Sequence, residues 1–265
     1  MRRGRETMRK TWRRARVAAS LAVLGALVGC ATPGPNHLFL AGAGPAPIHD
    51  VSTGGEAENV EALPGMVAPG ERVVGLAYDY NTDYLWLRVM PWNQLRVVNR
   101  PAKRIEANYA FGEPRFDPTV VSLDLATRSA DLHVFAVSDS GRAIVELTRR
   151  GVRLREFAIG DGARPIGGLS YDQRHDRLLV LWSDGQPTVA ICDRDGAVQH
   201  TVVLQAPVDA RSLGFDSDRQ VLFVPLPRAD RIGEFDLGGR LLHERAVPEG
   251  TWALDAGPRS MVRVF

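Results

Sequence analysis

A weak repeat of about 45 residues runs through most of this chain and constrains its fold more than any other feature. Four segments share a leucine close to a polar turn, at 74–79, 121–124, 167–172 and 211–216. An apolar run follows each turn, and then a second turn, a third run and a fourth run. Four short runs joined by tight turns predict four antiparallel strands per unit. Repeats of this size built from four strands are typical of propeller blades.

The polarity of the runs supports the same interpretation. The second run of each unit is apolar at nearly every position, as in 85–87 and 178–182. That pattern is expected for strands covered on both faces by neighbouring sheets. The fourth run is interrupted by charges, as in 153–156 and 243–245, which suits an outer strand that must resist edge pairing. No sustained helical periodicity follows Cys30, so an all-β fold is favoured over a parallel α/β fold.

The two ends of the repeat give the number of blades. Segment 251–255 has the pattern of a fifth first strand, with a turn at 257–259 and a candidate second strand at 261–265. Segment 37–55 aligns with 221–239, so it supplies later strands of that same blade. The sequence therefore predicts a five-bladed β-propeller over residues 37–265, its closing blade shared by N-terminal and C-terminal strands. Either end could provide the second strand, and a six-bladed ring is the alternative.

The N-terminus has the pattern of a targeting segment. An arginine-rich stretch precedes residues 17–29, which carry no charge, and Cys30 follows directly. The order of charge, apolar run, Gly29 and thiol resembles the bacterial lipobox, which implies a lipoprotein signal peptide over 1–29 and acylation of Cys30. Residues 30–36 would then form a tether to the membrane. The apolar run is too short to span a bilayer, and an ordinary secretory signal is the alternative.

The charge balance bears on location and partners. Of 33 Lys and Arg residues, eight lie in the first 29 positions, and of 31 acids only Glu6 does, which leaves 25 bases against 30 acids. The body is therefore acidic, which argues against a nucleic-acid partner. Ala31 after the lipidated cysteine favours an outer-membrane location in a Gram-negative cell, facing the periplasm. Cys192 lies in an apolar run and is expected to be a small buried side chain.

Two repeat units carry a family resemblance. Segments 168–181 and 230–239 resemble blades of bacterial NHL-type, SdiA-regulated and phytase-esterase-like propellers. This resemblance implies that the chain has the same propeller fold. The last two families often carry a glutamate before the Gly-Leu of the first strand, where this chain has Val74, Gly167 and Arg211. The resemblance therefore does not extend to metal-dependent chemistry. We expect no cofactor, and the run 193–196, which is similar to part of a Ca²⁺ loop, lacks the distal glutamate and favours a hairpin turn.

Candidate functional residues gather in two sets of loops. In a propeller, the loops from fourth to first strand and from second to third strand share one face around the channel. Here they contain arginines, carboxylates and one tryptophan: Arg72, Trp92, Arg115, Asp117, Asp139, Arg142, Asp161, Arg164, Asp209, Arg211, Arg228 and Asp230. Guanidinium groups could bind a carboxylate or carbonyl partner. The alternatives are ion pairs between blades and turn-forming aspartates, and for Trp92 packing on a neighbouring blade.

Motifs of catalysis are missing from the sequence. It contains no Gly-x-Ser-x-Gly, His-Glu-x-x-His, phosphate-binding glycine loop or Cys-x-x-Cys. The sequence therefore predicts a lipid-anchored envelope module that binds or scaffolds a protein or a polar small molecule. A metal-assisted hydrolase or lactonase that uses Asp117, Asp161 and Asp209 is the alternative.

Overall fold

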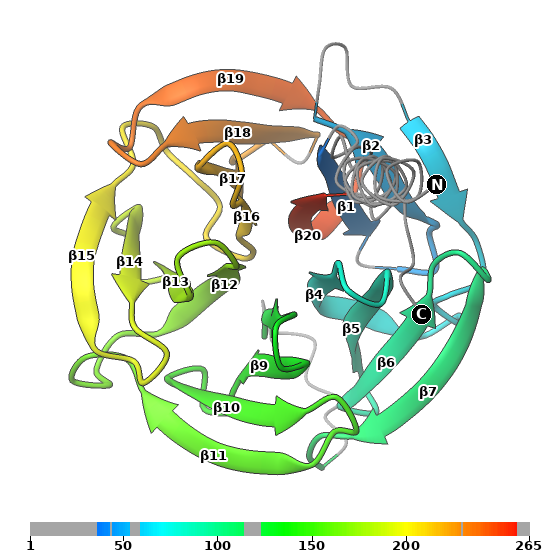
Figure 1. Cartoon of the computed structure of the whole chain (residues 1–265). Helices are drawn as coiled ribbons and strands as arrows, with labels where there is room; N and C mark the ends of the chain where they lie inside the picture. Colours follow the sequence, from blue (N-terminus) through cyan, green and yellow to red (C-terminus); the bar gives the residue numbers. More distant parts are fainter. Residues whose placement is uncertain (1–35, 43, 54–58, 114–122, 229, 259–265) are drawn as a thin grey trace, which may run out of the picture. The chain divides into compact units, whose positions relative to one another are not determined.

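The computed structural model describes residues 36–42, 44–53, 59–113, 123–228 and 230–258. The predicted leader and Cys30 lie outside this part of the chain. The described strands form five antiparallel sheets of four strands, arranged around a central axis (Figure 1). The predicted five-bladed β-propeller is therefore confirmed. Within the described residues, no helix has the length and apolar character needed to cross a membrane.

The strands of each blade are given in order from the central axis outward. The first blade contains β4 (Arg72–Asp79), β5 (Tyr84–Met90), β6 (Gln94–Asn99) and β7 (Arg104–Ala110). The second contains β8 (Leu125–Arg128), β9 (His133–Val137), β10 (Ala143–Thr148) and β11 (Arg153–Ala158). The third contains β12 (Ile166–Asp172), β13 (Arg177–Trp182), β14 (Thr188–Cys192) and β15 (Val198–Val203). The fourth contains β16 (Gly214–Asp216), β17 (Val221–Pro225), β18 (Arg231–Asp236) and β19 (Leu241–Ala246).

The closing blade joins the two ends of the propeller. Its innermost strand is β20 (Thr251–Pro258), followed by β1 (Asn36–Gly42), β2 (Ile48–Ser52) and β3 (Asn59–Leu63). Antiparallel pairing between β1 and β20 places Asn36 opposite Pro258 and Leu40 opposite Leu254. The N-terminal segment thus supplies the second strand. The turn predicted at 257–259 is wrong at its first two positions, because Gly257 and Pro258 continue β20 beside β1; segment 261–265 lies outside the described residues.

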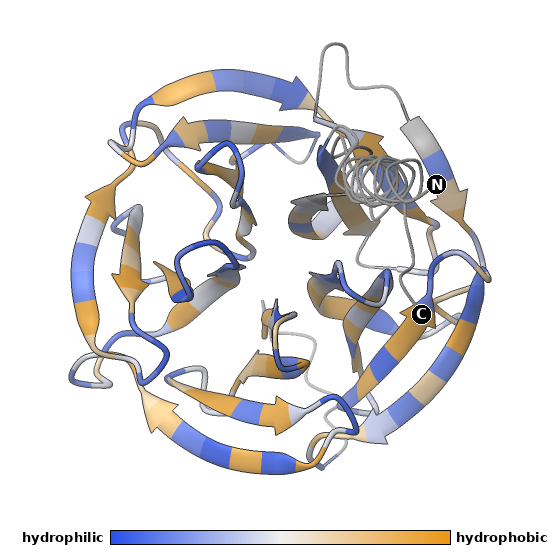
Figure 2. Cartoon of the chain, in the orientation of Figure 1, coloured by the Kyte–Doolittle hydropathy of each residue, from blue (hydrophilic) through white to orange (hydrophobic). Residues whose placement is uncertain are grey.

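Burial follows the predicted order of strands. The second strands β5, β13 and β17 are buried almost throughout, whereas the fourth strands β7, β11 and β19 alternate exposed and half-buried residues. Figure 2 shows hydrophilic and hydrophobic residues as bands along the outer strands. Complete burial of one large aliphatic or aromatic side chain contributes about 1.5–3 kcal/mol. Contacts between the faces of neighbouring blades therefore supply most of the apolar stabilisation.

The inner strands converge so closely that side chains must be small there. A Cβ at Gly75 would lie 2.5 Å from the carbonyl oxygen of Leu123, and one at Gly168 would lie 2.7 Å from the carbonyl carbon of Ser212. Contacts link β4, β8, β12, β16 and β20 in a closed cycle, although no two of them pair in one sheet. Glycine thus permits neighbouring main chains to meet near the axis.

The alignment of the second blade requires a correction. Its repeated leucine is Leu125, which pairs with Ala136 just as Leu76 pairs with Leu87; the sequence pattern selects Leu123 instead. The error arises because Arg128 stands at the start of the first hairpin, where the first, third and fourth blades have aspartate. The shift of two residues places Asp124 at the position that glycine occupies in the first and third blades.

Candidate functional site

The predicted binding residues fall on one end of the propeller, which we call the arginine face. It is formed by the connections that precede each first strand and by those that join second to third strands. Arg115 and Asp117 lie outside the described residues. Trp92 follows β5 and is 52% exposed, so about half of its surface is accessible at this end of the propeller.

Asp139 joins the second blade to the first. Its carboxylate lies 2.5 Å from a guanidinium nitrogen of Arg88, a fully buried side chain of β5, and 3.2 Å from the amide nitrogen of Asn93. The Arg88 guanidinium also stacks over the Phe111 ring, 3.9 Å from its centroid. The buried Arg88 guanidinium is thus stabilised by a carboxylate, a side-chain amide and an aromatic ring. Asp139 therefore forms an ion pair between two blades, which the sequence allowed as the alternative to a binding role.

Two further arginines combine a carboxylate with an indole. Arg164 donates to Asp184 at 2.6 Å and lies 4.8 Å from the Trp182 ring centroid. This hydrogen bond lowers the pKa of Asp184 below its ordinary value. Arg211 lies 3.3 Å from Asp209 and 4.6 Å from the Trp252 ring centroid. The third blade and the boundary of the fourth with the closing blade thus present the same arrangement of guanidinium, carboxylate and indole.

The remaining predicted residues shape loops. Arg142 donates to the Ala163 carbonyl, which links the second blade to the third, and the Asp161 carboxylate accepts from the Ala163 amide at 3.0 Å. Arg72 is the half-buried first residue of β4. The exposed residues Arg228 and Asp230 flank the turn between β17 and β18, where the Arg228 carbonyl accepts from Arg231 and that of Asp230 from Val247. All of these contacts are hydrogen bonds that fix the conformation of the loops.

The fully buried carboxylate of Asp124, near the central axis, was not predicted from the sequence. Asp124 accepts hydrogen bonds from the main-chain amides of Leu76, Leu169 and Leu213, at 3.3, 3.0 and 3.1 Å. The Ser212 hydroxyl donates to it as well, at 3.1 Å. Burial raises the pKa of Asp124 well above its ordinary value, although the amide donors oppose this shift. One side chain thus connects the inner strands of four blades.

A second axial carboxylate comes from the closing blade. Asp255 accepts hydrogen bonds from the amides of Tyr78 and Ala256, at 2.8 and 2.9 Å, and from the Ser170 hydroxyl at 3.1 Å. Burial raises its pKa to about 7, against the effect of these donors. Small residues occupy the equivalent position elsewhere, such as Ala77 and Gly214. A carboxylate among small residues was the sequence signal that could have identified it.

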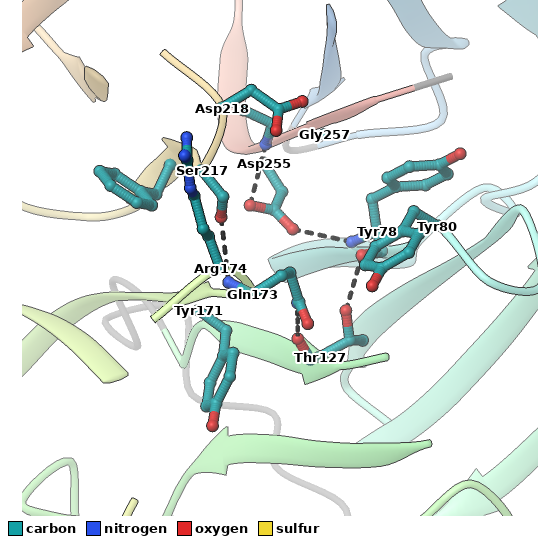
Figure 3. Close-up of a pocket in the computed structure, with 12 residues that line it drawn as sticks. Tyr78, Tyr80, Thr127, Tyr171, Gln173, Arg174, Ser217, Asp218, Asp255 and Gly257 are labelled. Carbon is teal, nitrogen blue, oxygen red and sulfur yellow. Dashed lines mark hydrogen bonds between the residues drawn. The ribbon is translucent and has the colours of Figure 1, made fainter. Parts of the chain in front are cut away.

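Beside Asp255 a pocket opens at the other end of the propeller, where first strands turn into second strands. We call this end the tether face, because Asn36 and Pro258 also lie there. The pocket has a volume of about 250 Å³, and all five blades contribute to its wall (Figure 3). Tyr80, Thr127 and Asp218 are among the lining residues. None of the residues selected from the sequence lines this pocket.

Neither metal nor thiol chemistry is indicated by the side chains described. Among residues 36–42, 44–53, 59–113, 123–228 and 230–258, no three or more His, Cys, Asp or Glu residues are grouped to hold a metal ion. Cys192 is fully buried, and burial raises its pKa to about 12. It is therefore a small packed side chain, as expected from its apolar surroundings.

Comparisons with known proteins identify the fold. No protein-family model matches the chain, and no curated protein matches its sequence. A chain from the crystal structure of a nidogen/laminin complex is similar over 84% of this chain and 99% of its own length, with a TM-score of 0.59 and 13% identity. The glutaminyl cyclase of Myxococcus xanthus is similar over 66% and 70%, with a TM-score of 0.51 and 15% identity. At these identities the likeness shows a shared β-propeller fold alone.

Proposed function

We propose that this chain is a lipid-anchored β-propeller of the cell envelope that binds a protein or a polar small molecule through its arginine face. The position of Asn36 carries the proposal. Asn36 pairs with Pro258 at the tether face, whereas Trp92, Arg164 and Arg211 belong to loops at the opposite end of the blades. An anchor attached before Asn36 therefore leaves the arginine face open to partners.

The length of the tether supports this orientation. Five residues lie between Cys30 and Asn36, and a fully extended chain across these six Cα–Cα steps reaches about 20 Å. An acyl anchor on Cys30 would hold the tether face near the bilayer. Two or three acyl chains give stable attachment, whereas one chain would be reversible. The outer-membrane assignment made from Ala31 is part of the same proposal.

The side chains of the arginine face suit recognition of a partner. The Arg164 side chain is about one-third exposed and is held in place by Asp184 and Trp182, so little side-chain entropy is lost when a partner binds. Arg211 is held in the same way by Asp209 and Trp252 but is almost buried. At the same end of the propeller, Trp92 exposes about half of a large indole. Tryptophan and arginine are the residues most enriched among energetically dominant contacts of protein interfaces. A partner that offers carbonyl or carboxylate groups together with an apolar surface would match this face.

Anchoring is tested with the full chain in a Gram-negative host. We expect the wild-type protein in the membrane fraction, with mass spectrometry showing a diacylated Cys30 at the mature N-terminus. The Cys30→Ala variant should leave that fraction or keep its leader. An unmodified Cys30, or equal fractionation of the two proteins, would refute the anchor.

Partner binding is tested on the same cells by cross-linking. Trp92→Ala combined with Arg164→Ala should lose the cross-linked species that wild type forms. The matched control is Arg104→Ala combined with Ile105→Ala, which changes exposed residues of the outer strand β7. If the first variant keeps every species, the arginine face is not the binding surface.

The enzymatic alternative is less well supported by the contacts. A metal site that includes Asp161 and Asp209 would have to break existing interactions, since Asp161 caps the Ala163 amide and Asp209 pairs with Arg211. One structural neighbour is named as a glutaminyl cyclase, but it shares only the fold. We expect the melting temperature to be unchanged by a chelator. A decrease on chelation, reversed by Ca²⁺ or Zn²⁺, would instead favour the hydrolase or lactonase.

A further inference from the structure

The pocket at the tether face presents two exposed side chains of opposite charge. Arg174 follows β12 and Asp218 follows β16, and both side chains are exposed at the pocket wall. Their main-chain amides bond to Asp172 and Asp216, each at 3.0 Å. Within the part of the chain that the structure describes, neither Arg174 nor Asp218 makes a side-chain hydrogen bond or ion pair.

Aromatic residues also line this pocket. Tyr80 is half-buried against the core of the first blade, and Phe215 is almost fully buried. Figure 3 shows Arg174, Asp218 and Tyr80 on different sides of the pocket, with Asp255 between them. Burial and the nearby carboxylates of Asp79 and Asp218 raise the pKa of Tyr80, so its ring remains neutral at physiological pH. A neutral tyrosine ring beside a carboxylate is a favourable site for an ammonium group.

We propose that this pocket binds a compact zwitterion, its anionic group held by Arg174 and its ammonium group held by Asp218 and the ring of Tyr80. A ligand with only one charge would cover both rim groups and satisfy one of them, leaving the other desolvated without a partner. A zwitterion satisfies both. This site is separate from the arginine face and does not depend on the partner proposed for that face.

The volume of the pocket limits the size of the ligand. About 250 Å³ is below the usual range for drug-sized ligands and suits on the order of ten non-hydrogen atoms. Free α-amino acids have this size and carry both charges. The ethanolamine headgroup of a phospholipid also carries an ammonium and an anionic group. Both sources share the chemistry that Arg174 and Asp218 recognise.

The test is titration calorimetry on the full chain in detergent, with individual α-amino acids and glycerophosphoethanolamine as probes. We expect at least one zwitterion to bind. Its N-acetyl or methyl-ester form, or for glycerophosphoethanolamine its N-acetyl form, should bind at least about tenfold more weakly, because a charge-assisted hydrogen bond is lost. Binding of amino acids alone or of the headgroup compound alone identifies the source, and either result supports the site.

Variants at the two rim positions complete the test. Arg174→Gln and Asp218→Asn should each weaken binding about tenfold or more, whereas Arg174→Lys and Asp218→Glu should retain part of it. The matched controls Arg149→Gln and Glu244→Gln alter exposed residues outside this pocket and should bind like wild type. Melting curves confirm that each variant is folded. Failure of every zwitterion to bind, equal binding of the singly charged forms, or unchanged binding by both rim variants would overturn the proposal.

Discussion

Asp124 holds together inner strands that do not pair with one another. Its carboxylate accepts the amides of Leu76, Leu169 and Leu213, which belong to three blades. A buried amide that loses its acceptor costs about 1–3 kcal/mol, so several losses at one point are severe. The axial carboxylate therefore contributes to ring closure in addition to the apolar contacts between blades.

Replacement of Asp124 should measure this contribution. We expect Asp124→Ala to lower the free energy of unfolding by about 3–5 kcal/mol, because three buried amides lose their acceptor. The Ser212 hydroxyl can still donate to the Leu254 carbonyl. Asp124→Asn keeps one acceptor oxygen and should lose less. Urea denaturation provides the measurement, with the exposed Asp161→Ala as the control. Equal stability of Asp124→Ala and this control would show that the axial hydrogen bonds contribute nothing.

Asp255 should make stability depend on pH. In the folded protein its pKa is about 7 against an ordinary value of 3.8, so the native state retains a proton that the unfolded chain has lost between those values. Stability therefore falls as pH rises through this window. The loss is complete above pH 7 and reaches about 4 kcal/mol. Asp124 shifts in the same direction.

Comparison with Asp255→Asn isolates this effect from the other groups. Carboxylates with lowered pKa, such as Asp172 and Asp184, lose stabilising contacts as pH falls, and they act equally in both proteins. From pH 5 to pH 8, wild type should lose about 3 kcal/mol relative to Asp255→Asn, as measured by urea midpoints. Asp161→Asn should follow wild type. A difference that stays constant across this range would contradict the assignment.

At the scale of elements, the apolar and charged runs predict the strands well. The second strands found at β5, β9, β13 and β17 match the apolar runs, because burial on both faces leaves an unmistakable pattern. The sequence pattern aligns the second blade two residues early, because Arg128 replaces the aspartate that starts the first hairpin elsewhere. The local sequence pattern cannot correct this error, because the register of β8 is fixed only by its pairing with β9.

A hairpin that contacts the neighbouring blade should be sensitive to added side chains. Gly239, at the turn before β19, has a φ of 81°, and a Cβ there would lie 2.0 Å from the Val203 carbonyl oxygen of the third blade. Its own carbonyl accepts the Gln205 amide at 2.8 Å, so the two blades cannot separate freely. This turn therefore depends on glycine both for its backbone conformation and for its close approach.

Two alanine substitutions separate these effects. Gly185 has a similar φ of 86°, but a Cβ at this position would have no other atom within 4 Å, so Gly185→Ala should cost about 1 kcal/mol from backbone strain alone. Gly239→Ala should cost about 2 kcal/mol more, because the Val203 carbonyl must move. Thermal or urea unfolding of both variants provides the comparison. Equal losses would mean that the third and fourth blades are not in the contact described.

At the scale of the whole molecule, closure of the ring was predictable and the sites were less so. The match between segments 37–55 and 221–239 predicted that the N-terminal segment belongs to the closing blade, because repeats preserve the order of strands. It left open which end supplies the second strand, which the pairing of β1 with β20 decides. The order of strands predicts that the loops of the arginine face share one end of the blades, and those that the structure describes lie there. The axial carboxylates and the tether-face pocket were not found, since they form only where inner strands from several blades converge.

Ring closure also gives the molecule a direction. Because β1 lies beside β20, Asn36 and Pro258 share the tether face with the pocket, and the arginine face lies at the other end. The proposal of an envelope-anchored binding module depends on this direction. The proposed tether of five residues would allow the propeller to tilt, but it would be too short to let the two faces exchange places freely.

The most direct measurement of this claim uses vesicles whose headgroups carry a nitroxide quencher. Fluorophores are attached to the lipidated full chain through Ala130→Cys on the tether face or Gln186→Cys on the arginine face, both at exposed positions; the native Cys192 is buried. The account predicts strong quenching at position 130, weak quenching at position 186, and none at either in Cys30→Ala. Equal quenching at both positions, or stronger quenching at 186, would contradict it.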